Sequence, residues 1–200
     1  MKPEIRQQIL RLGGRVTAPP VATLPEFLQA TTFAHPLYPR RYAEEVLGLD
    51  VFYDQNRDLY AANPAAFDEA LLLHFFADHE LPYGQDFFRN FRFTPFTPDT
   101  PDYGELEDLV SPADLHSVVA GTDPLEFICI CYSYGFPDHY FVCLSDPAPD
   151  NPTVYGTDHE VFFQEITAVG TLENFFSRYL SKEEFLAIAQ QHFAARNAAE

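Results

Sequence analysis

The second half of the chain is a succession of short apolar runs separated by residues that interrupt regular structure. Each run is rich in β-branched and aromatic residues, and Pro, Asp, Asn or Gly stand between one run and the next. Short strands joined by short loops pair with their neighbours in sequence, which gives an antiparallel meander. We therefore expect a sheet built from four runs: LEFICICYS (125–133), YFVCL (140–144), TVYG (153–156) and EVFFQEI (160–166).

Helix signals flank this region on both sides. Asn63-Pro64 is a strong helix start, and the residues after it (65–80) carry apolar side chains at a spacing of four. Towards the other end, Ser181 and Glu184 form the S-x-x-E pattern of a capping box. This pattern predicts a last helix over 182–197.

Together these signals predict a single α+β domain over residues 1–200, with helices at the N-terminus, an antiparallel sheet formed mainly by the C-terminal half, and closing helices. We expect residues 1–60 to be helical and extended, with LDVFYD (49–54) as a strand, residues 61–124 to hold a helix and loops, and residues 125–200 to form the meander and closing helices. The order helices, strands, helices argues against a doubly wound parallel sheet.

The acidic residues are concentrated in one part of the chain. The net charge is -18, although residues 1–60 hold equal numbers of basic and acidic side chains, seven of each. Residues 61–200 hold five basic and 23 acidic side chains. Between Arg92 and Arg178 there is no Lys or Arg, and there are 15 Asp and Glu. Such a surface repels nucleic-acid phosphates and anionic membranes and attracts a basic protein.

Other sequence features favour a cytoplasmic protein. The N-terminal stretch MKPEIRQQILRLGG is charged and lacks the apolar run of a secretory signal. No stretch approaches the 18 consecutive apolar residues of a membrane span. The three cysteines are odd in number and clustered, which does not suit a secreted disulfide framework.

The cysteines themselves could serve as zinc ligands or as core residues. Cys129 and Cys131 lie two apart, so on a strand both thiols would share one face, and Cys143 lies on the next run. Three thiolates can bind zinc. Buried strand cysteines more often act as small apolar side chains, and we expect these three to pack in the core.

Asp158, His159 and Glu160 are three potential metal ligands in a row. On a strand, neighbouring side chains point to opposite faces, so only Asp158 and Glu160 are expected to share a side. The zinc motif H-E-x-x-H is incomplete, because Phe163 stands at its last position. We therefore predict no metal, no cofactor and no catalytic residue. One alternative stays open: a metal-dependent hydrolase that uses His139 together with these three residues.

From residue 125 to residue 180 the order of features resembles the Smi1/Knr4 domain, the SUKH superfamily. The matching pieces are the run NPTVY (151–155) after a polar loop, and LENFF (172–176) with Leu180 closing the helix that follows the last strand. The family also has an early Leu-Pro helix, for which Leu24-Pro25 and Leu81-Pro82 are both possible counterparts. Its Trp-Gly pair has no counterpart here, because the chain has no Trp.

The resemblance implies an α+β fold without catalysis. Bacterial members of the family are largely immunity proteins that bind and neutralise a toxin domain, often a nuclease, and eukaryotic members are interaction modules in signalling. An acidic inhibitor would suit the basic cleft of a nuclease, and acidic residues at an interface raise the association rate and specificity. A signalling or scaffold module is the other non-enzymatic possibility.

We therefore expect a non-enzymatic protein-binding module whose partner is a basic protein, and we expect it to bind neither nucleic acid nor membrane. Exposed aromatic side chains among the carboxylates would supply the contacts that contribute most to affinity; Tyr134, Phe136, Tyr140 and Tyr155 are candidates. The sequence leaves the oligomeric state open. The predicted partner-binding residues are Tyr134, Asp138, His139, Asp146, Asp150, Tyr155, Asp158 and Glu160.

Overall fold

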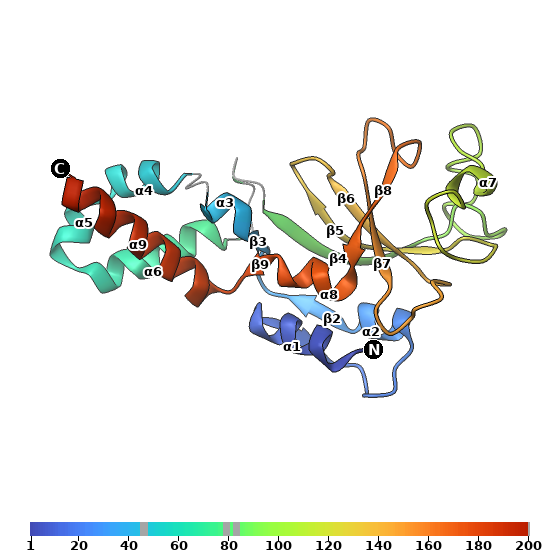
Figure 1. Ribbon diagram of the computed structural model, residues 1–200, viewed down its shortest axis with the longest axis horizontal. Helices are drawn as coiled ribbons and strands as arrows, with labels where there is room; N and C mark the ends of the chain where they lie inside the picture. The colour runs from blue at the N-terminus through green and yellow to red at the C-terminus, as the bar shows by residue number, and fades with distance from the viewer. Residues whose placement is uncertain (45–47, 78–80, 82–84, 200) are drawn as a thin grey trace.

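A five-stranded antiparallel sheet lies at the centre of the computed structural model, which describes residues 1–44, 48–77, 81 and 85–199 (Figure 1). The strands are β4 (Asp86–Phe93), β5 (Phe127–Ser133), β6 (His139–Cys143), β7 (Thr153–Thr157) and β8 (Ile166–Thr171). Each strand pairs with its neighbour in sequence, in the order β4-β5-β6-β7-β8. The α+β fold and the meander predicted from the sequence are therefore confirmed.

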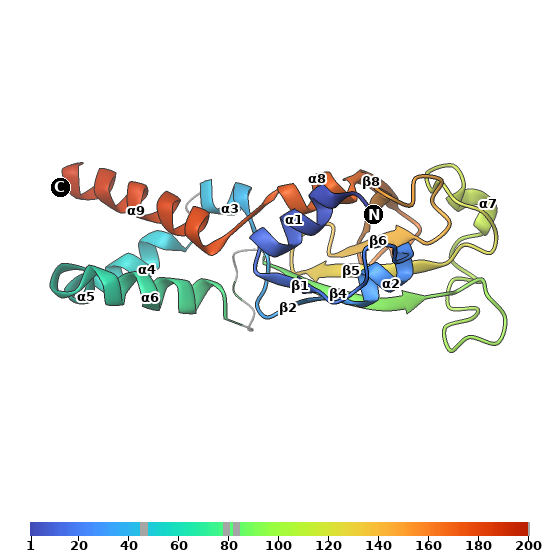
Figure 2. The ribbon, with the colours of Figure 1, turned by 90° about the horizontal axis from the view of Figure 1, so that it is seen from below.

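Three helices cover one face of the sheet: α1 (Pro3–Arg11), α2 (Leu24–Gln29) and α8 (Leu172–Ser177). The antiparallel pair of β1 (Gly14–Val16) and β2 (Thr31–Phe33), which are connected through α2, joins α1 to this layer (Figure 2). The layer is held by burial of apolar surface between helices and sheet. Its buried side chains include Ile5, Ile9, Phe27, Ile128, Ile130, Val142, Val154, Phe175 and Phe176.

Loops rather than helices cover the opposite face. The segment 94–126, which contains the short helix α7 (Pro112–Leu115), crosses this face and buries apolar side chains against it. Ser111 caps α7, as its position before Pro112 predicts, because its side chain accepts a hydrogen bond from the backbone N–H of Asp114. The buried residues on this face include Phe93, Leu106, Leu115, Val119, Phe127, Phe141, Tyr155 and Phe163.

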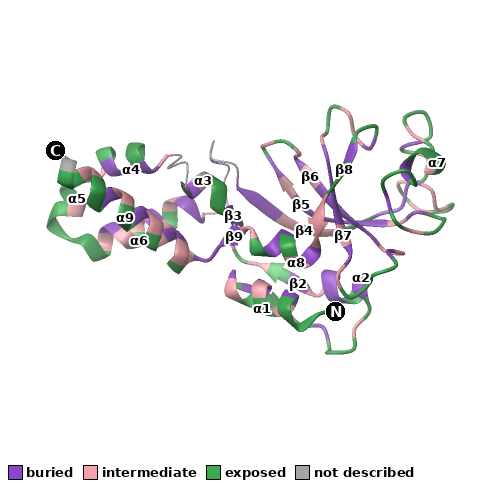
Figure 3. Ribbon diagram, in the orientation of Figure 1, coloured by how far each residue is buried: buried purple, intermediate pink, exposed green. Residues whose placement is uncertain are grey.

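A helical unit extends from the sheet and forms the left side of Figure 1. It contains α3 (Arg40–Glu44), α4 (Leu49–Gln55), α5 (Arg57–Ala62), α6 (Pro64–Phe75) and α9 (Lys182–Ala199). The strand pair β3 (Tyr38–Pro39) and β9 (Tyr179–Leu180) connects the unit to the sheet. Figure 3 shows its inward sides buried and its outer sides exposed. Its core is aromatic and includes Phe52, Tyr53, Phe67, Phe75, Phe185 and Phe193.

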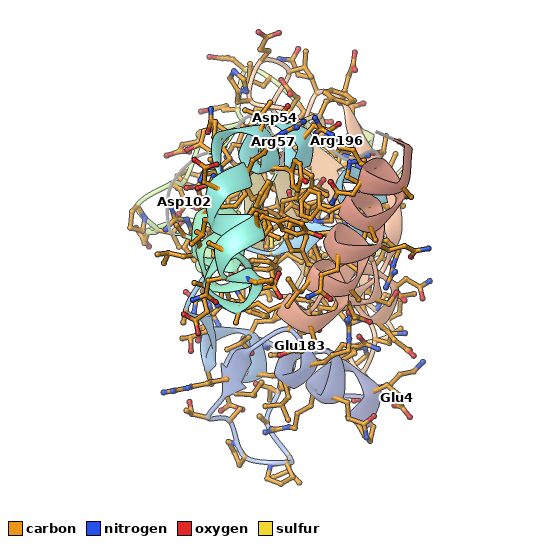
Figure 4. All side chains as sticks on the ribbon, turned by 90° about the vertical axis from the view of Figure 1, so that its left-hand side faces the viewer. Glu4, Asp54, Arg57, Asp102, Glu183 and Arg196 are labelled. Atoms are coloured by element: carbon orange, nitrogen blue, oxygen red, sulfur yellow. The ribbon has the colours of Figure 1, made fainter. Side chains whose placement is uncertain are left out.

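Ion pairs hold the C-terminal helix α9 against α4. The guanidinium of Arg196 donates hydrogen bonds to Asp50 and Asp54 at 2.7 Å each, and Arg57 contacts Asp54 at 3.0 Å. Figure 4 shows Asp54, Arg57 and Arg196 side by side where the two helices meet. The last helix therefore closes the fold onto a segment far away in sequence.

The helix starts predicted from the caps at Asn63 and Ser181 are confirmed. Asn63 accepts a hydrogen bond from the backbone N–H of Ala66 at the start of α6, which ends at Phe75. Ser181 and Glu184 form a reciprocal capping box at the start of α9. The last residues of the first predicted helix, 78–80, lie outside the described residues.

Two predicted strands are wrong. Residues 49–54 belong to α4, because Leu49, Phe52 and Tyr53 are buried at a spacing that fits one helix face. Residues 160–165 form a loop: β7 ends at Thr157 and β8 begins at Ile166. Within that loop Phe163 has a φ of 59°, in the left-handed region, which no strand residue adopts.

Strand β4 of the central sheet was missed. Region 61–124, expected to hold a helix and loops, also contributes this strand. Its register shifts between Phe88 and Phe91, so the alternation of inward and outward residues that identifies a strand is broken in its middle.

The cysteines lie in the core, as expected, but not on one face. Cys129, Cys131 and Cys143 are buried and free. A register shift in β5 between Cys129 and Cys131 turns the two thiols to opposite faces of the sheet. Burial raises the pKa of the Cys129 thiol to about 12, so this thiol stays protonated at neutral pH.

Among the described residues, no helix combines the length and the apolar character that a membrane crossing requires.

Candidate partner-binding site at one end of the sheet

Two loops leave the same end of the sheet. The β5–β6 loop (134–138) and the β7–β8 loop (158–165) project together at the top of Figure 1. The reason is the meander: β5 and β7 run in the same direction, and both pair with β6. His139, the first residue of β6, is paired with Thr157, the last residue of β7, so the two loops begin side by side.

The β5–β6 loop is a closed turn that presents two aromatic side chains. The N–H of Ser133 donates to the carbonyl of Asp138 at 2.7 Å, and the hydroxyl of Ser133 accepts from the N–H of Gly135 at 3.1 Å. Between these closing contacts, Tyr134 and Phe136 are 53% and 70% exposed. Large aromatic side chains held on a short, hydrogen-bonded loop are suited to binding another surface.

A glycine in β7 allows this loop to lie close to the sheet. A Cβ atom at Gly156 would lie 2.6 Å from Cγ of Pro137 and 3.2 Å from Cγ1 of Val169. Real side chains do not pack that closely, so the position accepts only a hydrogen atom. The contact between Pro137 and Gly156 thus sets how Asp138, the next residue in the loop, sits above the sheet.

The β7–β8 loop is anchored in the core at its far end. Phe163 is buried, with its ring 5.0 Å from those of Phe127 and Phe141, and its N–H donates to the hydroxyl of Thr157 at 2.9 Å. The anchor fixes one side of the loop. The residues that precede it, 158–160, are therefore presented next to the β5–β6 loop.

Asp138 links the two loops. Its Oδ1 accepts hydrogen bonds from Nδ1 of His139 at 2.7 Å and from the backbone N–H of His159 at 3.0 Å. Its Oδ2 contacts Nδ1 of His159. Asp158 joins the group, with Oδ1 3.6 Å from the same imidazole nitrogen. Asp138 is buried, so these contacts satisfy a carboxylate that would otherwise be costly to remove from water.

His159 is the titratable group that this cluster perturbs. The pKa of its imidazole is raised, first by the hydrogen bond to the carboxylate of Asp138, and also by the negative charges of Asp138, Asp158 and Glu160. Its ring is largely exposed to solvent. The imidazolium form is thus favoured over a wider range of pH than in a free histidine.

An open cleft of about 530 Å³ lies between the two loops. The aromatic rings of Tyr134 and Phe136 form one part of its wall, and carboxylates form another. Its lining residues include acidic side chains and one histidine but neither Lys nor Arg. The acidic residues that line it are Asp138, Asp158, Glu160 and Glu165. A cleft of this composition suits a cationic side chain, which gains from both charge and aromatic faces.

Five of the eight predicted partner-binding residues lie at this end of the sheet. Four of them, Tyr134, Asp138, Asp158 and Glu160, line the cleft. His139 lies behind it, bonded to Asp138, with its ring 6.3 Å from that of Phe141. Its contribution is therefore to hold the Asp138 carboxylate in place.

The other three predicted residues lie elsewhere. Asp146 is buried in the loop at the opposite end of β6, where it accepts hydrogen bonds from the N–H groups of Ala148 and Thr153. Asp150 is exposed in the same loop and contacts the N-terminal amine. Tyr155 is buried, and its hydroxyl accepts from the N–H of Ala120. Asp146 and Tyr155 thus organise loops, and neither is on the surface.

Burial also shows which of the four candidate aromatic side chains are available for contact with a partner. Tyr134 and Phe136 are exposed, whereas Tyr140 and Tyr155 are 3% and 1% exposed. The alternation along β6 and β7 places Tyr140 and Tyr155 on opposite faces of the sheet, one in each core layer.

The expectation that Asp158 and His159 point apart is wrong. It assumed a strand, but β7 ends at Thr157 and the chain bends at 159–160. The ligand atoms of Asp138, Asp158 and His159 all lie within 4.8 Å of one another. Among the described residues this is the group whose donor types and spacing could hold a metal ion.

Sequence reasoning missed Glu165 as a cleft residue. It was placed in a strand that the structure does not contain, and the residue is exposed in the loop. The signal that could have found it is the pair of adjacent Phe residues, 162 and 163, since burying one of them in a short loop turns the flanking acidic residues outward.

Comparisons of the chain with protein-family models, with curated proteins and with solved structures find no match.

Proposed function

We propose that this chain is a non-enzymatic protein-binding module, and that its contact surface is the cleft between the β5–β6 and β7–β8 loops. The observation that carries the proposal is the composition of the cleft. Two exposed aromatic rings, Tyr134 and Phe136, stand beside the carboxylates of Asp158, Glu160 and Glu165, without a Lys or Arg in the lining. Aromatic anchors surrounded by carboxylates are typical of an interface with a basic protein.

The distribution of charge over the whole chain supports a basic partner. The stretch that forms both loops belongs to the segment between Arg92 and Arg178, which has no Lys or Arg. A concentrated negative field of this kind accelerates encounter with a positively charged protein and repels nucleic acid. Interfaces that depend on such steering weaken as salt rises.

The finer proposal is an immunity protein that neutralises a cognate toxin, such as a nuclease. It rests on the resemblance of residues 125–180 to the Smi1/Knr4 domain and on the fit between an acidic cleft and the basic groove of a phosphate-binding enzyme. In that arrangement Tyr134 and Phe136 would contact the toxin beside its cationic residues. The carboxylates of the cleft would form ion pairs with those cationic residues.

Coexpression with the product of the adjacent gene tests the proposal. That product should inhibit growth when expressed alone, and coexpression of this chain should restore growth. The purified pair should bind with an affinity that falls as salt rises. Tyr134→Ala and Phe136→Ala should each weaken binding by about 1–2 kcal/mol or more, the range of interface aromatic anchors.

Tyr103→Ala is the matched control, because Tyr103 is an aromatic side chain of similar exposure (57%) that does not line the cleft. It should leave the affinity unchanged. If the neighbouring product is not toxic but binds through the cleft, the chain is a signalling or scaffold module. If the Tyr134 and Phe136 variants bind as well as the Tyr103 variant, the cleft is not the contact surface.

A metal-dependent hydrolase is the other function that the sequence leaves open. The convergence of Asp158 and His159 with Asp138 favours one part of it, a place for a metal ion. The other two residues of this alternative, His139 and Glu160, fit a hydrolase site less well. Nδ1 of His139 is bonded to Asp138 behind the cleft. Glu160 is exposed at the rim. We therefore propose binding rather than catalysis.

A further inference from the structure

We propose that Asp138, Asp158 and His159 form a binding site for one divalent transition-metal ion of the zinc class. The inference concerns the floor of the cleft and does not depend on the proposed function. It starts from the convergence of three ligand atoms, two carboxylate oxygens and one imidazole nitrogen, within 4.8 Å of one another. Ligand atoms around a tetrahedral ion with bonds of about 2.0–2.2 Å lie about 3.5 Å apart, so a small adjustment brings the three atoms to the spacing that one ion requires.

The ligands come from two loops that the sheet holds in register. Asp138 immediately precedes β6, and Asp158 immediately follows β7, because His139 and Thr157 are paired partners. Both carboxylates are largely shielded from solvent: the side chains of Asp138 and Asp158 are 10% and 15% exposed. Two ligands are thus fixed by the fold.

Contacts around the cluster orient its atoms. Oδ1 of Asp138 is occupied by Nδ1 of His139 and the backbone N–H of His159, which leaves Oδ2 directed to the cluster. Oδ1 of Asp158 accepts from the N–H of Glu160 at 2.9 Å. Such outer hydrogen bonds are the usual means by which proteins aim a ligand at a metal ion.

The third ligand is free to adjust. Nδ1 of His159 contacts Asp138 and lies 3.6 Å from Asp158, and its side chain is 68% exposed. The ion would take the place of the hydrogen bond that now joins the imidazole to the carboxylates. A small rotation of an exposed ring suffices for this change.

The set of donors selects the kind of ion. Imidazole nitrogen favours Zn²⁺ and similar ions over Mg²⁺ and Ca²⁺, which prefer oxygen ligands alone and more of them. Three protein ligands leave one position of a tetrahedral ion open. Glu160 and Glu165 also line the cleft beside these ligands.

Titration of the untagged protein with Zn²⁺ tests the proposal. The protein is treated with chelator, dialysed and titrated in a calorimeter, and it should bind one Zn²⁺ ion. His159→Ala should abolish this binding. Asp158→Asn should weaken it by about tenfold or more, since even outer contacts of a metal site contribute 10–100-fold. Mg²⁺ and Ca²⁺ should bind more weakly than Zn²⁺.

His116→Ala is the matched control. Nε2 of His116 lies 3.1 Å from a single carboxylate, that of Asp123, so this pair has the same groups without the second carboxylate. The variant should bind Zn²⁺ like the wild type. Thermal melts without metal verify that each variant is folded, and His159→Gln is the second variant if His159→Ala is unstable.

Absence of saturable Zn²⁺ binding by the wild-type protein overturns the proposal. So does binding that His159→Ala leaves intact, because the ion would then occupy other acidic groups. Partner binding measured with chelator present separates this inference from the proposed function. A failure of metal binding leaves the affinity for the partner unchanged, and a failure of partner binding leaves the metal stoichiometry unchanged.

Discussion

At the scale of single residues, the position of the candidate site depends on Gly156, which has no side chain. Gly156 has ordinary strand geometry, so its role is one of space rather than of backbone freedom. Pro137 fills that space and thereby brings the β5–β6 loop against β7. One hydrogen atom in place of a methyl group thus decides whether Asp138 can reach the neighbouring loop.

Gly156→Ala is expected to destabilise the fold and to disturb the site. The added methyl group would collide with Pro137, and overpacking of this kind costs about 1–3 kcal/mol. The free energy of unfolding, measured in urea, should fall by that amount. Thr167→Ala is the control, because Thr167 is paired with Gly156 but exposed, and its change should stay within about 0.5 kcal/mol. Equal stability of Gly156→Ala and wild type would contradict this packing argument.

Asp102 holds the long loop on the second face of the sheet. Its carboxylate accepts hydrogen bonds from the N–H and the hydroxyl of Thr94, the residue after β4. Burial alone would raise the pKa of Asp102, but several hydrogen bonds, chiefly those from Thr94, together outweigh it, and the pKa is lowered from its ordinary value of 3.8. Ionised Asp102 therefore stabilises the fold above that pH, and the stabilisation is lost as pH falls through the lowered pKa.

Asp102→Asn should accordingly remove a stabilisation that depends on pH. The wild type should be more resistant to urea than the variant at about pH 6, and the difference should shrink as the pH falls below 3.8 towards the lowered pKa of Asp102. Asp108→Asn, an exposed carboxylate in the same loop, is the control. A difference between wild type and Asp102→Asn that grows on acidification would show that the sign of the argument is wrong.

At the scale of elements, the cap of α9 is the clearest link between sequence pattern and structure. The hydroxyl of Ser181 accepts from the N–H of Glu184, whose carboxylate accepts from the N–H of Ser181. The same carboxylate contacts Arg11 of α1 and lies 3.6 Å from Arg40 of α3. The start of the last helix is thereby joined to the first layer of the fold.

Ser181→Ala should lower the free energy of unfolding by about 1 kcal/mol, the typical contribution of an N-cap. Ser177→Ala provides the comparison: the Ser177 hydroxyl is exposed and donates to Asn174 near the end of α8. The free energy of unfolding of Ser177→Ala should be close to that of the wild type. Urea unfolding of both proteins measures the difference, and a loss of equal size in the two would mean that the cap contributes nothing particular to α9.

Elements with local signals could be predicted, and elements that depend on distant contacts could not. The caps at Asn63 and Ser181 specify their helices because the capping bonds lie within four residues. The stretch 160–166 has the composition of a strand, yet Phe163 is drawn into an aromatic core made by Phe93, Phe127 and Phe141, and the chain turns to reach it. Residues 49–54 pack as a helix for a similar reason, because Phe52 and Tyr53 meet α6 and α9.

At the scale of the whole molecule, the site is a product of topology. The meander brings residues 134–138 and 158–165 to one end of the sheet and sends Asp146 and Asp150 to the other. The sequence predicted the acidic character of this region and, as partner-binding residues, four of the ten residues that line the cleft, but it could not distinguish the two ends of the sheet. The sequence also predicted that Asp158 and His159 lie on opposite faces of a strand. This prediction is wrong because the end of β7 at Thr157 is fixed by its pairing with β6, and no local sequence signal indicates that end.

We propose that the acidic cleft, and not the overall negative charge, binds the basic partner. The most direct test compares two double variants that change the net charge equally. Glu160→Lys with Glu165→Lys reverses charge in the cleft, whereas Glu105→Lys with Asp108→Lys reverses it on the exposed loop far along the chain. Their affinities for the neighbouring gene's product are measured at low and high salt. If the cleft is the contact surface, the affinity should fall by about 100-fold, roughly 3 kcal/mol, for the cleft pair at low salt and change little for the loop pair. Equal losses of affinity for the two pairs, or no loss for the cleft pair, would show that the cleft is not the contact surface.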